Sequence, residues 1–209
     1  MLNAAKVIVV LSMLWALGAL IIQVMMAWGG GRRDYSQRTG SPWRGVLYNF
    51  TVAMTPAHKE SVRRHPVKFA IGVVMHLGVL LALLGMVVSL AWPAFSGQVL
   101  AMARPVTAMA LVCGGYLLVR RASVAEMRGL STPEDFVAIL ATCGLLALGL
   151  WNPLAGAGRL CVLLYVGVFF LYLPLGKLRH AVFFFVARGD YGRRLGYRGV
   201  YPPTVVERD

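Results

Sequence analysis

The sequence has 209 residues, of which 58% are hydrophobic and only 14% are charged, and its formal net charge is +13. A soluble domain carries about 25% charged residues, so this composition excludes an ordinary soluble globular protein. A basic charge can indicate a nucleic-acid partner, but basic residues also collect in the cytoplasmic loops of membrane proteins. Because the charges here fall between long apolar runs, we expect a membrane protein and no nucleic-acid partner.

Apolar segments of about 20 residues are long enough to cross a bilayer as helices. The sequence contains five candidates, at residues 7–28, 67–92, 99–119, 136–151 and 160–186. The first is long for the apolar part of a signal peptide and is not followed by a small-residue cleavage site, so we expect a retained helix. The predicted fold class is therefore all-α, an integral membrane bundle of five transmembrane helices.

The basic residues predict the orientation of this bundle, because Lys and Arg are enriched on the cytoplasmic side. If the N-terminus lies outside, all but Lys6, Arg104 and Arg159 of the 21 Lys and Arg residues fall on the cytoplasmic side. We therefore expect a multi-pass protein of a bacterial or archaeal cytoplasmic (inner) membrane, with its N-terminus outside and its C-terminus in the cytoplasm.

Two loop sequences predict helix starts. Thr132-Pro133-Glu134-Asp135 offers an N-cap Thr, Pro at the first helical position and an acid at the third, and it begins the fourth span. Thr55-Pro56 repeats the pattern before a short basic helix, which we expect to lie on the membrane surface and to end at His65-Pro66. We expect residues 1–188 to form the transmembrane domain. Residues 189–209 are expected to form an irregular basic cytoplasmic tail that becomes ordered on binding a partner.

Two histidines are the candidate functional residues. His76 lies inside the second span, and His180 lies near the cytoplasmic part of the fifth. At 1.5 Å per residue they are about 13 Å and about 10 Å from the expected cytoplasmic ends of their helices. Imidazoles at similar depth on antiparallel helices are suited to ligate one haem iron from both faces. The alternative is that His76 hydrogen-bonds a neighbouring helix and His180 is an interfacial residue.

The surroundings of these histidines fit a haem. Gly72 lies one turn before His76, where the lack of a side chain would let a porphyrin lie against the helix. His65 could contact a propionate or a quinone headgroup, and its alternative is a surface-helix histidine. Lys and Arg side chains that snorkel to the membrane surface would also occur at this boundary in a protein without a cofactor. The basic residues that could pair with haem propionates are Arg63, Arg64, Lys177 and Arg179.

Three stretches between about residues 68 and 186 carry a family resemblance. They are Met75-His76-Leu77-Gly78 through Leu84-Gly85-Met86, the loop at Thr132-Pro133-Glu134-Asp135, and Leu171-Tyr172-Leu173-Pro174-Leu175-Gly176-Lys177-Leu178-Arg179-His180. On these the chain resembles the gamma subunit of respiratory nitrate reductase, a b-type cytochrome, and its relatives in heterodisulfide-reductase-like and sulfate-reducer redox complexes. The last stretch is the most specific.

The resemblance implies a respiratory-chain subunit that exchanges electrons with menaquinol or ubiquinol through haem b. An iron–sulfur subunit would dock at its cytoplasmic face, and His76 and His180 would be the axial ligands of the haem nearest that partner. The family's two further haem ligands are replaced here by Met86 and Val162. One haem b is therefore expected, with Met86 packed in the core and a heterodisulfide-reductase-like partner.

Three other classes of function are alternatives to this one. The main alternative is a cofactor-free membrane anchor for a soluble redox complex, which needs the basic loops but not the histidines. All eight acidic residues lie outside the apolar runs, which disfavours an ion-coupled transporter because such proteins usually need carboxylates in the membrane. No loop shows a nucleophile–base pair, so we expect no catalytic residues of the kind found in soluble enzymes.

Overall fold

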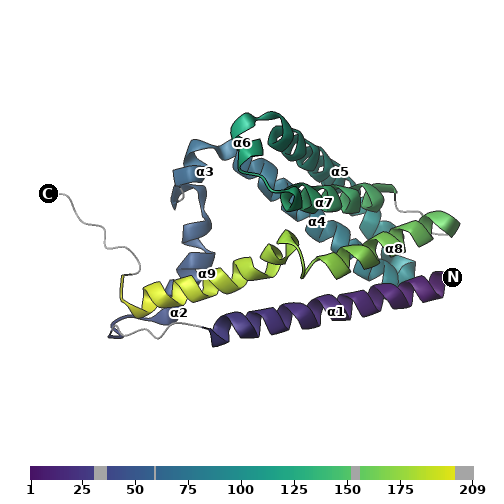
Figure 1. Cartoon of the computed structure of the whole chain (residues 1–209). Helices are drawn as coiled ribbons and strands as arrows, with labels where there is room; N and C mark the ends of the chain where they lie inside the picture. The colour runs from purple at the N-terminus through teal and green to yellow at the C-terminus, as the bar shows by residue number, and fades with distance from the viewer. Residues whose placement is uncertain (31–36, 59, 152–155, 201–209) are drawn as a thin grey trace. The chain divides into compact units, whose positions relative to one another are not determined.

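A computed structural model describes residues 1–30, 37–58, 60–151 and 156–200 of the chain (Figure 1). Throughout these ranges the secondary structure is helical, without strands. The chain divides into two compact units, Met1–Ala19 with Val67–Leu178 and Leu20–Pro66 with Arg179–Asp209. Each unit is described separately below.

The first unit is a bundle of apolar helices. Pro is the first residue of three of them, where its missing N–H has no intrahelical partner to lose. The helices are α1 (Leu2–Gly29), whose second half belongs to the other unit, α4 (Pro66–Ala91), α5 (Pro93–Ser123), α6 (Ala125–Gly129), α7 (Pro133–Trp151) and α8 (Gly156–Tyr172).

Four described helices are long and apolar enough to cross a membrane: α1, α4, α7 and the part of α5 over Ala101–Ser123. The pair Gly156–Tyr172 and Lys177–Tyr197 makes a fifth span if this broken pair is counted as one. Only 17% to 28% of each of the four apolar windows is buried within the protein. Because soluble proteins rarely expose such large apolar surfaces, the architecture is that expected of a multi-pass membrane protein.

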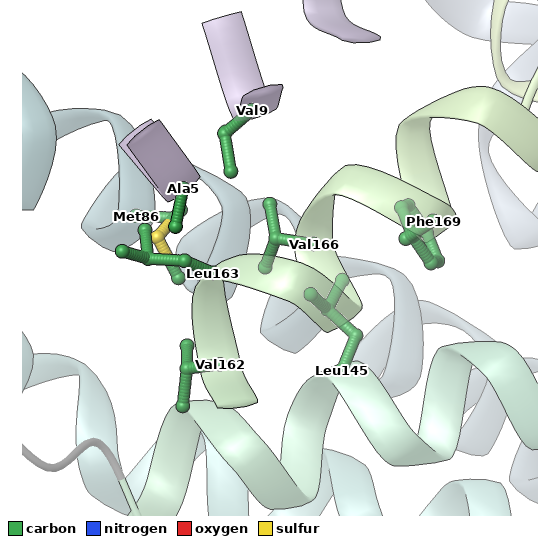
Figure 2. Packing of buried hydrophobic residues seen from close by; sticks show 8 residues of the cluster. All are labelled: Ala5, Val9, Met86, Leu145, Val162, Leu163, Val166 and Phe169. Carbon is green, nitrogen blue, oxygen red and sulfur yellow. The ribbon is translucent and has the colours of Figure 1, made fainter. Parts of the chain in front are cut away.

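The core of the first unit lies where α1, α4, α7 and α8 meet (Figure 2). Small residues bring further helices together: a Cβ added at Gly78 of α4 would collide with Ala110 of α5, and one at Gly114 would lie 2.7 Å from Cys143 Sγ of α7. Such small contacts are typical of helix packing in membranes. The buried cluster consists of Ala5, Val9, Met86, Leu145, Val162, Leu163, Val166 and Phe169.

The predicted helix start at Pro133 is confirmed, whereas Thr55-Pro56 begins a 3₁₀ turn and the short helix begins only at Glu60. At the start of α7, Asp135 Oδ2 accepts hydrogen bonds from the Thr132 backbone N–H at 2.9 Å and from its hydroxyl at 3.0 Å. Thr55 precedes the 3₁₀ turn η2 (Pro56–His58), and the short helix α3 (Glu60–Arg64) ends before Pro66 begins α4. The position of α3 on a membrane surface stays a prediction.

The fifth apolar segment is not the continuous helix expected over 160–186. α8 ends at Tyr172, and Pro174, which has no N–H to donate to a helix, lies in the break before η3 (Lys177–Arg179) and α9 (His180–Tyr197). The expected irregular backbone from residue 189 is also wrong, since α9 continues to Tyr197. Residues 201–209 of the predicted tail lie outside the described residues.

The second unit is built around a helix that the sequence did not predict. α2 (Pro42–Phe50) begins at the N-cap Ser41, whose side chain accepts a hydrogen bond from the Arg44 backbone N–H at 3.5 Å. It packs on α9, and the backbone N–H groups of Thr39 and Gly40 donate to the Tyr197 carbonyl at 3.0 and 3.2 Å. The 3₁₀ turn η1 (Val52–Met54) connects α2 to η2.

Candidate functional site

His76 lies on α4, and its side chain is exposed at the surface of the first unit. Its Nδ1 is 2.6 Å from the carbonyl oxygen of Gly72, one turn earlier. A carbonyl oxygen only accepts hydrogen bonds, so Nδ1 carries the proton and the lone pair of the neutral ring lies on Nε2. Metal-binding histidines are commonly oriented by such a bond from the other ring nitrogen. His76 is therefore held in the tautomer that ligates through Nε2.

The backbone at Gly72 leaves room beside this imidazole. A Cβ added to Gly72 would have no described heavy atom within 4 Å. The face of α4 that carries Gly72 and His76 is thus open within its unit, as the haem prediction requires. Gly72 has two roles here, since its carbonyl orients His76 and its missing side chain leaves the adjacent surface flat.

His180 is the first residue of α9 and belongs to the second unit, where its side chain is exposed. Arg179 precedes it at the N-cap position in a helical backbone conformation and is also exposed. The estimate of depth for His180 assumed a helix that ends near residue 186, and α9 does not end there. Because the two histidines belong to different units, their joint ligation of a haem stays a prediction.

Lys177 is engaged by an acidic residue at the start of α7. Its Nζ donates to Asp135 Oδ2 at 2.7 Å and to Thr132 Oγ1 at 3.0 Å. Arg121 at the end of α5 lies 3.3 Å from the other carboxylate oxygen of Asp135 and donates to Ser131 Oγ at 3.0 Å. Three helix ends are thereby tied together, and a haem propionate would compete with Asp135 for the ammonium group of Lys177.

Arg63, Arg64 and His65 occupy the end of α3 and the junction that follows it, and all three are exposed. The His65 backbone N–H donates to the Val62 carbonyl at 3.1 Å, which closes α3. α4 begins only at Pro66. His65 therefore lies outside the helix that carries His76.

The two positions that the resemblance would align with further haem ligands are packed in the core. Met86 is 7% exposed and Val162 is 1% exposed, and both belong to the cluster of Figure 2. The expected role of Met86 in core packing is confirmed. Arg159, expected in an outer loop, instead lies on α8 with 6% of its surface exposed, and its Nη2 donates to Ser89 Oγ at 2.8 Å.

A polar pair in the second unit was not foreseen. Asn49 of α2 is 3% exposed, and its Nδ2 donates to the Arg188 carbonyl of α9 at 2.6 Å. Arg188 Nε also donates to Met54 Sδ at 3.1 Å, and its guanidinium lies 5.5 Å from the centre of the Phe184 ring. Two features of the sequence could have predicted this contact. Ser41-Pro42 is a typical helix start, and Gly192 lies four residues before Gly196, a spacing that lets helices pack closely.

Among the residues that the structure describes, no three His, Cys, Asp or Glu side chains gather as a metal-binding group. A haem iron held by two histidines does not require such a group. No family model matches the chain, and neither a curated protein nor a solved structure matches it. The likeness to the nitrate reductase gamma subunit thus stays a prediction from the sequence.

Proposed function

We propose that His76 and His180 ligate one b-type haem, and that the protein transfers electrons between a membrane quinone pool and an iron–sulfur partner on the cytoplasmic side. The observation that carries this proposal is the 2.6 Å hydrogen bond from His76 Nδ1 to the Gly72 carbonyl. It assigns the lone pair to Nε2 and fixes the direction of the ring. The space beside Gly72 is free of described atoms within 4 Å of an added Cβ, which leaves room for a porphyrin on the same face as His76.

The chain supplies ligation, orientation and charge. His76 and His180 would hold the iron, and the exposed Arg179, Arg63 and Arg64 would neutralise propionates or the charge of a quinone headgroup. When bound, the haem supplies one-electron oxidation and reduction, with a potential that depends on its axial ligands and surroundings. Menaquinol or ubiquinol would be the membrane substrate.

Basic residues on the expected cytoplasmic side support docking of an acidic or iron–sulfur partner. Exposed arginines occur on α2, α3 and α6, and opposite charges across an interface steer association and set its orientation. These residues are Arg44, Arg63, Arg64 and Arg128. Basic loops would also serve a cofactor-free anchor, and the presence of haem distinguishes the two functions.

The test is the reduced-minus-oxidised absorption spectrum of the purified full-length protein. We expect an alpha band typical of haem b in the wild type, and its loss in both His76→Ala and His180→Ala. His58→Ala is the matched control, since His58 is an exposed histidine that hydrogen-bonds Thr55 at 2.9 Å, and this variant should keep the band.

Two results would contradict the proposal. A band that survives in both ligand variants would show that other residues hold the haem. A wild-type protein that has no haem but still co-purifies with a redox complex would identify a membrane anchor instead. The ratio of haem to polypeptide in the wild type, expected to be one, checks the number of haems independently.

A further inference from the structure

A groove in the second unit combines an apolar wall with arginine side chains. It lies between the C-terminal end of α1 and one face of α9 and has a volume of about 670 Å³. Trp28 and Phe185, here called the aromatic wall, line it together with Val186, and Arg193 and Arg194 line it further along α9. A groove of this size is in the range of small-molecule sites, with room for far more than a single phosphate ion.

The charges at the groove do not balance. Asp190 is the acidic residue that lines it, and its two oxygens pair with Arg193 at 3.0 Å and with Arg194 at 2.8 Å. Two guanidinium groups thus share one carboxylate, which leaves one positive charge. The side chains of Arg193 and Arg194 remain 65% and 44% exposed, so both retain N–H donors that a ligand can reach. Guanidinium groups match phosphate oxygens in geometry and charge.

The aromatic wall indicates the level of the membrane at which the groove lies. α1 has the length and hydropathy of a membrane span, and Trp28 is next to its last residue. Trp at the end of a span is typical of the headgroup region, where an amphipathic ring contacts both acyl chains and polar groups. Trp28 is 64% exposed and Phe185 is 61% exposed, so the apolar surface is accessible to a chain beside the arginines.

From this combination we infer that the groove binds an anionic phospholipid, with its phosphate at Arg193 and Arg194 and the upper part of an acyl chain on the aromatic wall. The excess positive charge selects an anionic headgroup over a zwitterionic one, because basic residues at the membrane surface attract anionic lipids. This inference does not depend on haem binding, and its measurement has no haem signal in it.

The experiment uses the full-length protein in detergent, mixed with equal amounts of phosphatidylglycerol and phosphatidylcholine, and counts retained lipids by native mass spectrometry. The wild type should retain phosphatidylglycerol preferentially. Arg193→Gln/Arg194→Gln should reduce that preference about 30-fold, and Arg193→Lys/Arg194→Lys should keep most of it. The matched control is Arg44→Gln/Arg128→Gln, which removes the same charge at exposed arginines outside the groove and should retain the wild-type preference.

Three outcomes would overturn the inference. One is a wild type that retains both lipids equally. Another is an equal loss of phosphatidylglycerol preference in the control variant, which would show that the preference depends only on the overall charge of the protein. The third is displacement of the lipid by excess inorganic phosphate, which would show a site for the phosphate group alone. Circular dichroism of each variant checks that the total helix content is unchanged, and Trp28→Leu should weaken retention of both lipids.

Discussion

Gly45 of α2 and Gly192 of α9 meet backbone to backbone. A Cβ added to Gly192 would lie 2.7 Å from the Gly45 carbonyl oxygen and 2.8 Å from the Val46 Cα. Gly196, one turn later, is in similar contact with the Ser41 carbonyl. Real Cβ atoms do not approach backbone this closely, so α2 and α9 can pack in this way only while these positions lack side chains.

Replacement of Gly192 by Ala should therefore separate α2 from α9. We expect a loss of about 1–3 kcal/mol in the stability of the second unit, the usual cost of overpacking. Limited proteolysis of the segment 37–58 and thermal unfolding in detergent would measure it. Gly115→Ala is the control, because a Cβ there meets no described atom within 4 Å and Ala is the better helix former. Equal behaviour of the two variants would contradict the close contact.

Asn49→Ala should also destabilise the second unit. The substitution leaves the Arg188 carbonyl without the 2.6 Å bond from Asn49 Nδ2, in a place where Asn49 is 3% exposed. Because the Arg188 carbonyl keeps its backbone bond within α9, the expected cost is that of one lost hydrogen bond, about 0.5–1.5 kcal/mol. Thermal unfolding would detect the loss, and the exposed Asn3→Ala on α1 should leave the midpoint unchanged. No shift for Asn49→Ala would indicate that water replaces the amide.

Asp135→Asn should loosen the junction of α5, α7 and Lys177. The variant removes the charge that Lys177 and Arg121 share at 2.7 and 3.3 Å. We expect a lower unfolding temperature than in the wild type, and a smaller difference at high salt because screening weakens partly exposed pairs. Glu126→Gln, at an exposed acid on α6, is the control. A difference that persists undiminished in high salt would assign the effect to helix capping at Thr132.

Ser89→Ala should destabilise the first unit, because Ser89 Oγ accepts the 2.8 Å hydrogen bond from Arg159 Nη2 between α4 and α8. Interhelical hydrogen bonds of membrane proteins contribute about 1 kcal/mol. Thermal unfolding measures the change, with Ser123→Ala as control since Ser123 is exposed and bonds locally to the Val119 carbonyl. If both variants unfold at the same temperature, the hydrogen bond from Arg159 to Ser89 does not contribute to stability.

Apolar length and capping residues were sufficient to predict α1, α4, α5 and α7, because each is a long hydrophobic run and Thr132-Pro133 marks one start. They failed in the fifth segment, where hydropathy concealed the effect of Pro174 and Gly176. They also failed at α9, since Gly192 and Gly196 read as breakers of structure. There the glycines serve close helix contact, which depends on α2, a short helix far away in the sequence.

The candidate site was likewise predicted only in part. Residue type and spacing singled out His76 and Gly72, which are one turn apart on one helix. The hydrogen bond between them involves a backbone carbonyl, and a pattern of side chains carries no information on such a partner. Lys177 was predicted to lie near propionates, and this stays a prediction; its partner Asp135, 42 residues earlier, was not predicted. Tertiary partners of this kind are set by packing.

The contact between α2 and α9 has a consequence for biosynthesis. Asn49 and Arg188 are 139 residues apart, so at 5–20 residues per second the ribosome makes α2 about 7 to 28 seconds before its partner. During that interval the surface that carries Gly45 and Asn49 lacks α9, and water or headgroups must solvate its amide. α2 can pack on α9 only after translation passes Tyr197. A transcript truncated upstream of α9 would therefore yield a protein in which α2 has no helix to pack on.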